Sequence, residues 1–112
     1  MKYIDGYLIP VPTANRDLYR EHLKQAQLLF KEYGALEMSE FWGDDLPPGK
    51  QTSMQLAVDM QEGETVVFGL IAWESKESRD AAWEKLRGEE RMHDTPMPFD
   101  GKRMIHGGFT EV

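Results

Sequence analysis

The stretch TVVFGLIAW, Thr65 to Trp73, decides the fold of this chain of 112 residues. It is apolar at nearly every position, which is typical of a strand buried on both faces at the centre of a sheet. Its alternate residues form two groups, and both groups are apolar: Val66, Phe68, Leu70 and Ala72, then Val67, Gly69, Ile71 and Trp73. We therefore expect helices to cover one face of the sheet and a separate cover to protect the other.

Strands and helices alternate on either side of this central strand. The expected elements are a strand over 2–12, a helix over 13–34, a strand over 35–43, a helix over 75–92 and a closing strand over 102–112. Thr13 or Asn15 can cap the first helix, Gly34 ends it, and Ser75 caps the second. The order predicts an α+β, ferredoxin-like βαββαβ fold, with a four-stranded antiparallel sheet and both helices on one face.

Two segments between these elements are less regular. Asp44–Ser53 has the composition of a loop, and His93–Gly101, with two prolines, is a second loop. Met54–Met60 is short enough to be either a strand or one helical turn. Because the chain has no linker or repeat, we expect a single domain over residues 1–112.

The face of the sheet away from the helices is expected to be apolar. Tyr3 and Tyr7 on the first strand and Trp42 on the second are expected to add aromatic area to it. Monomeric proteins rarely expose so large an apolar surface. The simplest cover is a second copy of the chain, so we expect a homodimer through the sheet faces. The alternative is that the loop Asp44–Met60 folds over this face.

Composition and charge exclude several classes of partner and site. The net charge of −7 argues against binding nucleic acid or an anionic membrane, and the chain has no cysteine for a disulfide or a thiolate metal site. No apolar run reaches about 18 residues, and the amino-terminal segment is a poor signal peptide. We expect a cytoplasmic protein with no cofactor and no metal.

Four stretches resemble the YbaA-like family of bacterial proteins: KYIDGYLIPVP, LFKEYGALEMSEFWGDDLPPGK, ETVVFGLIAWESKESRDAAWEKL and, most specifically, MPFDGKRMIHGGF. The resemblance covers nearly the whole chain. It implies the dimeric α/β-barrel superfamily, in which two ferredoxin-like sheets close a barrel, and it implies no activity. The family pattern carries tyrosine where this chain has His106, which argues against a family-wide catalytic role for that residue.

Several polar and aromatic side chains are candidates for a site. Asp5 and His106 are the candidate catalytic residues, since each suits proton transfer if it lines a cavity. Tyr7, Trp42, Trp73 and Arg103 are candidate ligand-binding residues. Each has a structural alternative: Asp5 paired with Lys102 or Arg103 across a dimer, His106 facing solvent, the tryptophans filling a core, and Arg103 paired at a strand end. The Gly107–Gly108 pair indicates a bulge or the close approach of a bulky group to the last strand. That group is either a ligand or, as we favour, a packed side chain of a helix, such as Trp83.

These residues support two classes of function. The first is a homodimer that binds a small, partly apolar molecule in a cavity beside the sheet. The alternative is a cofactor-independent enzyme, similar to a monooxygenase or an isomerase, as superfamily relatives imply. Analogy with haem-degrading relatives makes His93 a weaker candidate haem ligand, and a protein-interaction module with a filled interior is a third idea. A cavity with convergent polar groups favours the first two classes.

Overall fold

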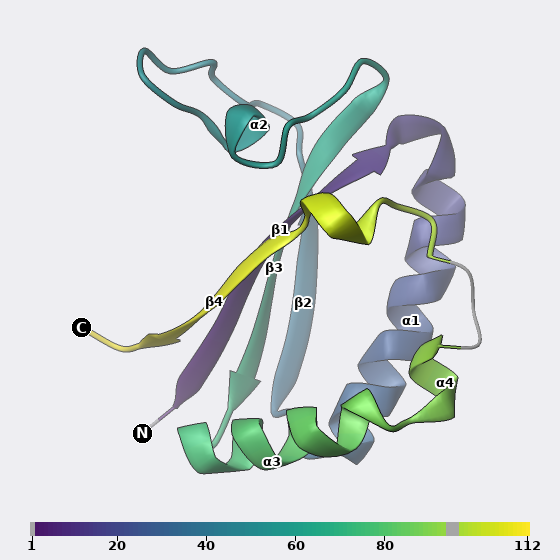
Figure 1. Ribbon diagram of the computed structural model, residues 1–112, viewed down its shortest axis with the longest axis vertical. Helices are drawn as coiled ribbons and strands as arrows, with labels where there is room; N and C mark the ends of the chain where they lie inside the picture. The colour runs from purple at the N-terminus through teal and green to yellow at the C-terminus, as the bar shows by residue number, and fades with distance from the viewer. Residues whose placement is uncertain (1, 94–96) are drawn as a thin grey trace.

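The computed structural model describes residues 2–93 and 97–112, and it confirms the ferredoxin-like fold. Four antiparallel strands form one sheet in the order β2-β3-β1-β4 (Figure 1). The strands are β1 (Tyr3–Pro12), β2 (Glu37–Trp42), β3 (Glu64–Trp73) and β4 (Ile105–Thr110). The helices are α1 (Arg16–Glu32), α2 (Met54–Ala57), α3 (Lys76–Arg87) and α4 (Glu90–His93). Two short 3₁₀ helices are η1 (Thr13–Asn15) and η2 (Gly101–Arg103). Within these ranges no helix is long and apolar enough to cross a membrane.

The two long helices share one face of the sheet but cover different parts of it. Helix α1 runs alongside the strands, whereas α3 runs across the end of the sheet near the amino terminus (Figure 1). The helices therefore do not lie side by side as a closed layer. This splayed arrangement leaves a hollow between the helices, which side chains of β1 and β4 help to line.

Helix boundaries differ from the sequence prediction at two points and agree with it at a third. Asn15 precedes α1 but makes no capping bond, because its side-chain amide donates to the carbonyl oxygen of Pro98 at 3.1 Å. Ser75 caps α3 as predicted, accepting from the backbone N–H of Ser78 at 3.1 Å. The predicted second helix ends early, at Gly88, where glycine's poor helix propensity separates α3 from α4.

The ambiguous segment Met54–Met60 forms one helical turn, α2. Ser53 caps it by accepting from the backbone N–H of Leu56 at 3.1 Å. The last strand starts later than expected, since Lys102 and Arg103 belong to η2 and β4 begins at Ile105. Of the predicted loop 93–101, residues 94–96 and the side chain of His93 lie outside the described part of the chain.

The strand register shows which side chains face the helices. Tyr3, Asp5 and Tyr7 share a face of β1, and Asp5 makes its contacts with α3. Trp42 lies on that same face of β2. The expectation that Tyr3, Tyr7 and Trp42 enlarge the opposite face is therefore wrong, because the alternation of a strand fixes relative faces but not which face meets the helices.

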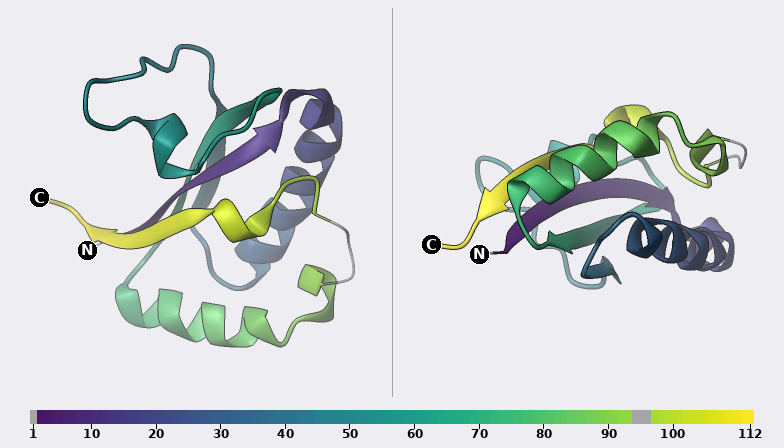
Figure 2. Two further views of the ribbon diagram at one scale, coloured as in Figure 1. Left: turned by 45° about the horizontal axis from the view of Figure 1, so that its top comes forward. Right: turned by 90° about the horizontal axis from the view of Figure 1, so that it is seen from below.

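The opposite face, which we call the open face, is apolar and only partly covered. The loop carrying α2 lies on this side, away from α1 (Figure 2), and at that end Val58 and Val66 are 1% and 2% exposed. Beyond the loop, the face presents large exposed side chains: Phe41, Phe68, Ile105 and Phe109. The loop thus covers one end of the open face and leaves an aromatic surface without a cover.

Asp5 attaches α3 to the sheet. Its carboxylate accepts from the guanidinium of Arg79, with Nη2 at 2.8 Å and Nε at 3.0 Å from Oδ1. The indole N–H groups of Trp73 and Trp83 both donate to Oδ2 at 2.9 Å. The ring of Tyr3 lies 5.2 Å from the guanidinium carbon of Arg79. One buried carboxylate therefore joins β1, β3 and α3.

Removing the charge of Asp5 tests this attachment. We expect Asp5→Asn to lower the free energy of unfolding by about 3 kcal/mol, because the largely buried Arg79 guanidinium then keeps only Asp80, at the surface, as a counter-charge. Urea unfolding measures the change. Asp17→Asn, which breaks an exposed pair with Arg20, is the matched control and should have little effect. Equal effects of the two substitutions would contradict the attachment.

Candidate functional site

The splayed helices enclose a large hollow on the helix-covered face. We call it the helix-face cleft: its floor is formed by Tyr7 and Glu40 of the sheet, and its walls come from α1, α3, α4 and the segment 97–104. Its volume is about 1590 Å³. Small-molecule sites usually measure roughly 300–1,000 Å³. The cleft is therefore ample for a ligand.

The floor of the cleft follows one row across the sheet. His106, Tyr7, Gly69 and Glu40 are register partners on β4, β1, β3 and β2. A Cβ atom at Gly69 would lie 2.2 Å from the ring of Tyr7. Tyr7 thus extends flat across β3 in the space that only glycine leaves, and its hydroxyl reaches a residue two strands away.

That residue is Glu40, which accepts hydrogen bonds from two tyrosines. The Tyr7 hydroxyl donates to Oε2 at 2.5 Å, and the Tyr19 hydroxyl of α1 donates to Oε1. Burial raises the pKa of Glu40 above its usual value, although both hydroxyls act in the opposite direction. Burial and the neighbouring carboxylate raise the pKa values of both tyrosines, which keeps them as donors.

Aromatic rings surround this cluster on the side of α1. The ring of Phe99 lies 5.7 Å from that of Tyr19 and 5.9 Å from that of His22. Burial lowers the pKa of His22, so its imidazole is neutral at neutral pH. The ring of Trp42 lies behind Tyr19, with 6.3 Å between the two ring centroids. The guanidinium carbon of Arg16 lies over the Trp42 ring, 5.1 Å from its centroid.

Methionines form much of the remaining wall. Met38, Met92, Met97 and Met104 come from four separate parts of the chain and all line the helix-face cleft. Thioether side chains are flexible and polarisable, so a wall made of them adapts to ligands of different shape. The cleft therefore combines an adaptable apolar wall with one polar cluster.

The two candidate catalytic residues from the sequence differ in their surroundings. His106 is exposed, lines the cleft and lies beside Tyr7 in the register. Asp5 also lines the cleft, but both of its oxygens already accept bonds, and its cationic partner is Arg79 of α3 in the same chain. The sequence analysis named Lys102 or Arg103 as the partner of Asp5 across a dimer, and it did not anticipate Arg79.

The candidate ligand-binding residues are spread over the molecule. Tyr7 lines the cleft floor, whereas Trp73 is 0% exposed and its N–H is used by Asp5. Arg103 lies outside the cleft lining and pairs with Glu64 through two bonds of 2.8 Å and with Asp100 at 3.0 Å. The contacts of Trp73 and Arg103 match the structural alternatives stated for them.

One glycine of the β4 pair, Gly108, permits the close packing of a bulky side chain that the sequence indicates. A Cβ atom at Gly108 would lie 2.2 Å from the Tyr3 hydroxyl, so the bulky group is a neighbouring strand residue. Gly107 is on the open face, where the nearest side chain to such an atom is that of Phe109. Neither glycine indicates a bound ligand.

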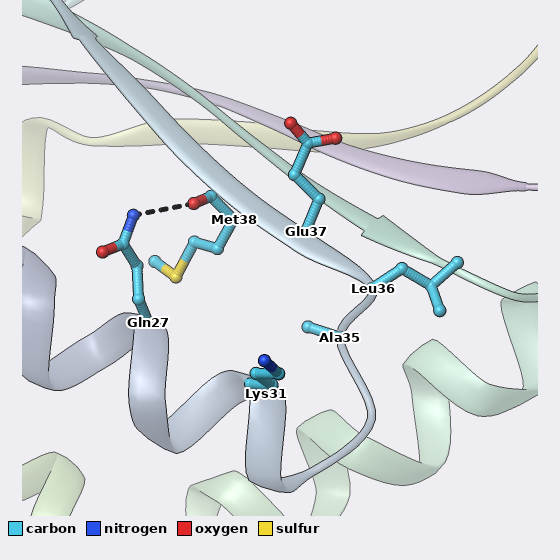
Figure 3. Close-up of a pocket in the computed structure, with 6 residues that line it drawn as sticks. All are labelled: Gln27, Lys31, Ala35, Leu36, Glu37 and Met38. Carbon is cyan, nitrogen blue, oxygen red and sulfur yellow. Dashed lines mark hydrogen bonds between the residues drawn. The ribbon is translucent and has the colours of Figure 1, made fainter.

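A smaller hollow of about 180 Å³ lies between the end of α1 and the start of β2 (Figure 3). Gln27 and Met38 face each other across it, and the Gln27 amide donates to the Met38 carbonyl oxygen at 2.9 Å. Glu37 points away from α1 (Figure 3). The contact ties α1 to β2, so we assign this hollow to packing. In the described parts of the chain, no group of three histidine or acidic residues is placed to hold a metal ion.

Sequence reasoning missed the central cluster. Glu40 shares a strand face with Trp42 but carries no motif, and Tyr19 reads as one more apolar residue on the inner stripe of α1. Their meeting depends on the register of three strands. The one local signal is Gly69, an isolated glycine in the most apolar strand, which indicates a close approach of another group.

The raised pKa of Glu40 predicts a pH-dependent cost to stability. Its native pKa is above the usual value of 4.5, so its contribution is most favourable below pH 4.5 and is lost as pH rises through the native pKa. We therefore expect wild-type protein to lose stability relative to Glu40→Gln as pH rises from about 4.5 to the native pKa, by at most about 1.4 kcal/mol per pH unit.

Urea unfolding of both proteins at a series of pH values measures this difference. The other carboxyl groups are common to both proteins and cancel in the comparison. A stability difference that stays constant from pH 4.5 to 8 would contradict a raised pKa for Glu40.

Solved structures of other proteins share this fold. A protein from Bacillus cereus, provisionally named an antibiotic biosynthesis monooxygenase, matches with a TM-score of 0.56 at 17% identity, over 98% of this chain and 90% of that one. A variant of SnoaB, a cofactor-independent oxygenase from Streptomyces nogalater, matches with a TM-score of 0.54 at 12% identity, over 98% and 92%. Identities this low show a common fold alone.

Closer relatives are found by sequence. The chain is 49% identical over 114 residues to YbaA, an uncharacterised protein of Escherichia coli K12, and to YbaA of Shigella flexneri, with 100% of this chain and 97% of each relative covered. The family described as a protein of unknown function, DUF1428, matches residues 2–101. These matches confirm the YbaA-like resemblance, and the chain therefore belongs to the DUF1428 family.

Proposed function

We propose that this protein binds a small, partly apolar molecule in the helix-face cleft. The supporting observation is the cleft itself, which combines an adaptable methionine and aromatic wall with the Glu40–Tyr7–Tyr19 cluster on its floor. A half-buried carboxylate with a raised pKa lowers stability at neutral pH. Groups of this kind gather at functional sites, and here Glu40 lies where a ligand would meet it.

Filling the cleft tests the binding proposal. Ala26 lies on α1 and lines the cleft, whereas Ala81 is exposed on α3 and does not. We expect Ala26→Trp to lower the fluorescence gain of the neutral apolar dye Nile red, because the indole occupies part of the ligand's space. Ala81→Trp, the matched control, should bind the dye as wild-type protein does. Circular dichroism verifies that both variants fold, and undiminished dye binding by Ala26→Trp would refute the proposal.

A cofactor-independent oxygenase or isomerase is the second candidate function. Its support is the description of SnoaB as a cofactor-independent oxygenase of the same fold, together with proton-accepting groups on the cleft wall. In this reading Glu40 or His106 accepts a proton from the substrate, and Asp5 positions Arg79. Mass spectrometry of a bound molecule before and after incubation in air detects the mass gained by oxygenation, and chromatography of the released molecule detects isomerisation, which leaves the mass unchanged.

We further propose that the protein is a cytoplasmic homodimer joined through the open face. The support for the dimer is the exposed aromatic surface of Phe41, Phe68 and Phe109 beyond the loop that carries α2. Burying such side chains against a second copy removes them from water, at about 25 cal/mol per Å² of apolar area. The absence of cysteine is compatible with a reducing compartment.

A charge on the open face tests the dimer. Phe68 is 43% exposed near the middle of this face, and we expect Phe68→Glu to convert the dimer into a monomer, because a carboxylate would be buried at the interface. Size-exclusion chromatography with light scattering measures the mass. Leu18→Glu, at a 65% exposed position on α1, is the control and should remain dimeric. A wild-type protein that is monomeric at high micromolar concentration would refute the dimer.

A further inference from the structure

Glu40 differs from the other carboxylates that line the helix-face cleft. Asp5 and Asp80 pair with Arg79, Glu21 pairs with Lys24, and Glu32 pairs with Arg91. Among the described residues, Glu40 has no cationic partner, and its hydrogen bonds come from two neutral hydroxyls. The most enclosed carboxylate that is free of a counter-charge is thus the one on the cleft floor.

Hydroxyl donors satisfy the hydrogen-bonding needs of a carboxylate only in part. Each oxygen of Glu40 accepts one bond from a tyrosine, so each keeps further acceptor capacity. The two tyrosine hydroxyls already donate their protons in hydrogen bonds to Glu40, so their oxygens can only accept a further bond. The cluster therefore offers an incoming molecule only acceptors, and the matching ligand group is a donor.

The surroundings of the cluster favour a positively charged donor. Tyr19 and Phe99 present aromatic rings beside it, and ring faces attract cations. His22 is neutral and does not repel a positive charge. The ring of Trp42, directly behind Tyr19, already holds a guanidinium. The net charge of −7 also draws cations towards the protein.

An anionic ligand fits these contacts poorly. Three guanidinium groups line the cleft, those of Arg79, Arg87 and Arg91. Arg79 and Arg91 are engaged by Asp5, Asp80, Glu32 and Glu89, and Arg87 also has an interaction of its own, so a carboxylate or phosphate would have to displace an existing contact. A neutral alcohol would satisfy the acceptors but leave the charge of Glu40 uncompensated. A protonated amine satisfies both requirements.

We propose that the ligand of the helix-face cleft is a protonated primary or secondary amine with an apolar body. The ammonium group lies on Glu40 and donates to its carboxylate, the rings of Tyr19 and Phe99 flank it, and the apolar body packs on the methionine wall. This inference rests on the proposed binding function and adds the chemical class of the ligand. It also explains how the half-buried, unneutralised carboxylate of Glu40 becomes favourable, since the bound cation supplies the missing counter-charge.

Three probes of one shape test the inference. 1-Naphthylmethylamine, 1-naphthylmethanol and 1-naphthoic acid differ in the charge and hydrogen-bonding character of one substituent. Isothermal titration calorimetry at pH 7 should give an affinity for the amine at least about tenfold above that for the alcohol, with the acid weakest. This comparison uses the wild-type protein, so it does not depend on whether a variant folds.

Two variants then locate the preference. Glu40→Gln removes the charge on the cleft floor and should bring the amine down to the affinity of the alcohol. Glu21→Gln removes the same charge from an exposed position at the cleft wall and should preserve the preference, which separates a specific contact from the net charge. A preference that survives Glu40→Gln, or that Glu21→Gln abolishes equally, would overturn the assignment to Glu40.

The probes distinguish the failure of this inference from that of the binding function. If none of the three binds, and Nile red does not bind either, the cleft is not a ligand site and both proposals fail. If the alcohol or the acid binds as tightly as the amine, the cleft binds apolar molecules and only the amine assignment is overturned.

Discussion

The attachment of α3 by Asp5 shapes the whole helix-covered face. Because Arg79, Trp73 and Trp83 converge on one carboxylate at the start of β1, α3 is held across the end of the sheet and not alongside α1. A buried charge is costly unless it is paired and hydrogen-bonded, and the guanidinium and the two indole donors supply those contacts here. The space that the splayed helices leave is the helix-face cleft.

The polar cluster in that cleft depends on a second constraint, the missing side chain at Gly69. Tyr7 crosses β3 over this glycine and meets Glu40, which α1 approaches with Tyr19. The result is a carboxylate that is hydrogen-bonded but not neutralised. Such a group lowers stability at neutral pH, and proteins commonly accept lower stability in exchange for function. A ligand cation would complete the cluster.

The two faces of the sheet carry different kinds of side chain. The helix-covered face carries the polar and titratable groups around the cleft, while the open face carries phenylalanines and aliphatic side chains beyond the loop of α2. The family and the fold agree with this architecture without naming an activity, so the chemistry has to be argued from Glu40 and its neighbours.

Local patterns in the sequence determined the element order, the central strand, the Ser75 cap and the apolar character of both sheet faces, because periodicity and capping act over a few residues. Among the site residues, Tyr7 was recognised as a candidate, whereas Glu40, Tyr19 and Arg79 were not. Only the tertiary structure decided which face meets the helices and which polar groups meet. The physical reason is that strand register and helix placement are set by contacts such as Asp5–Arg79, between residues far apart in the chain, whose partners no local pattern specifies.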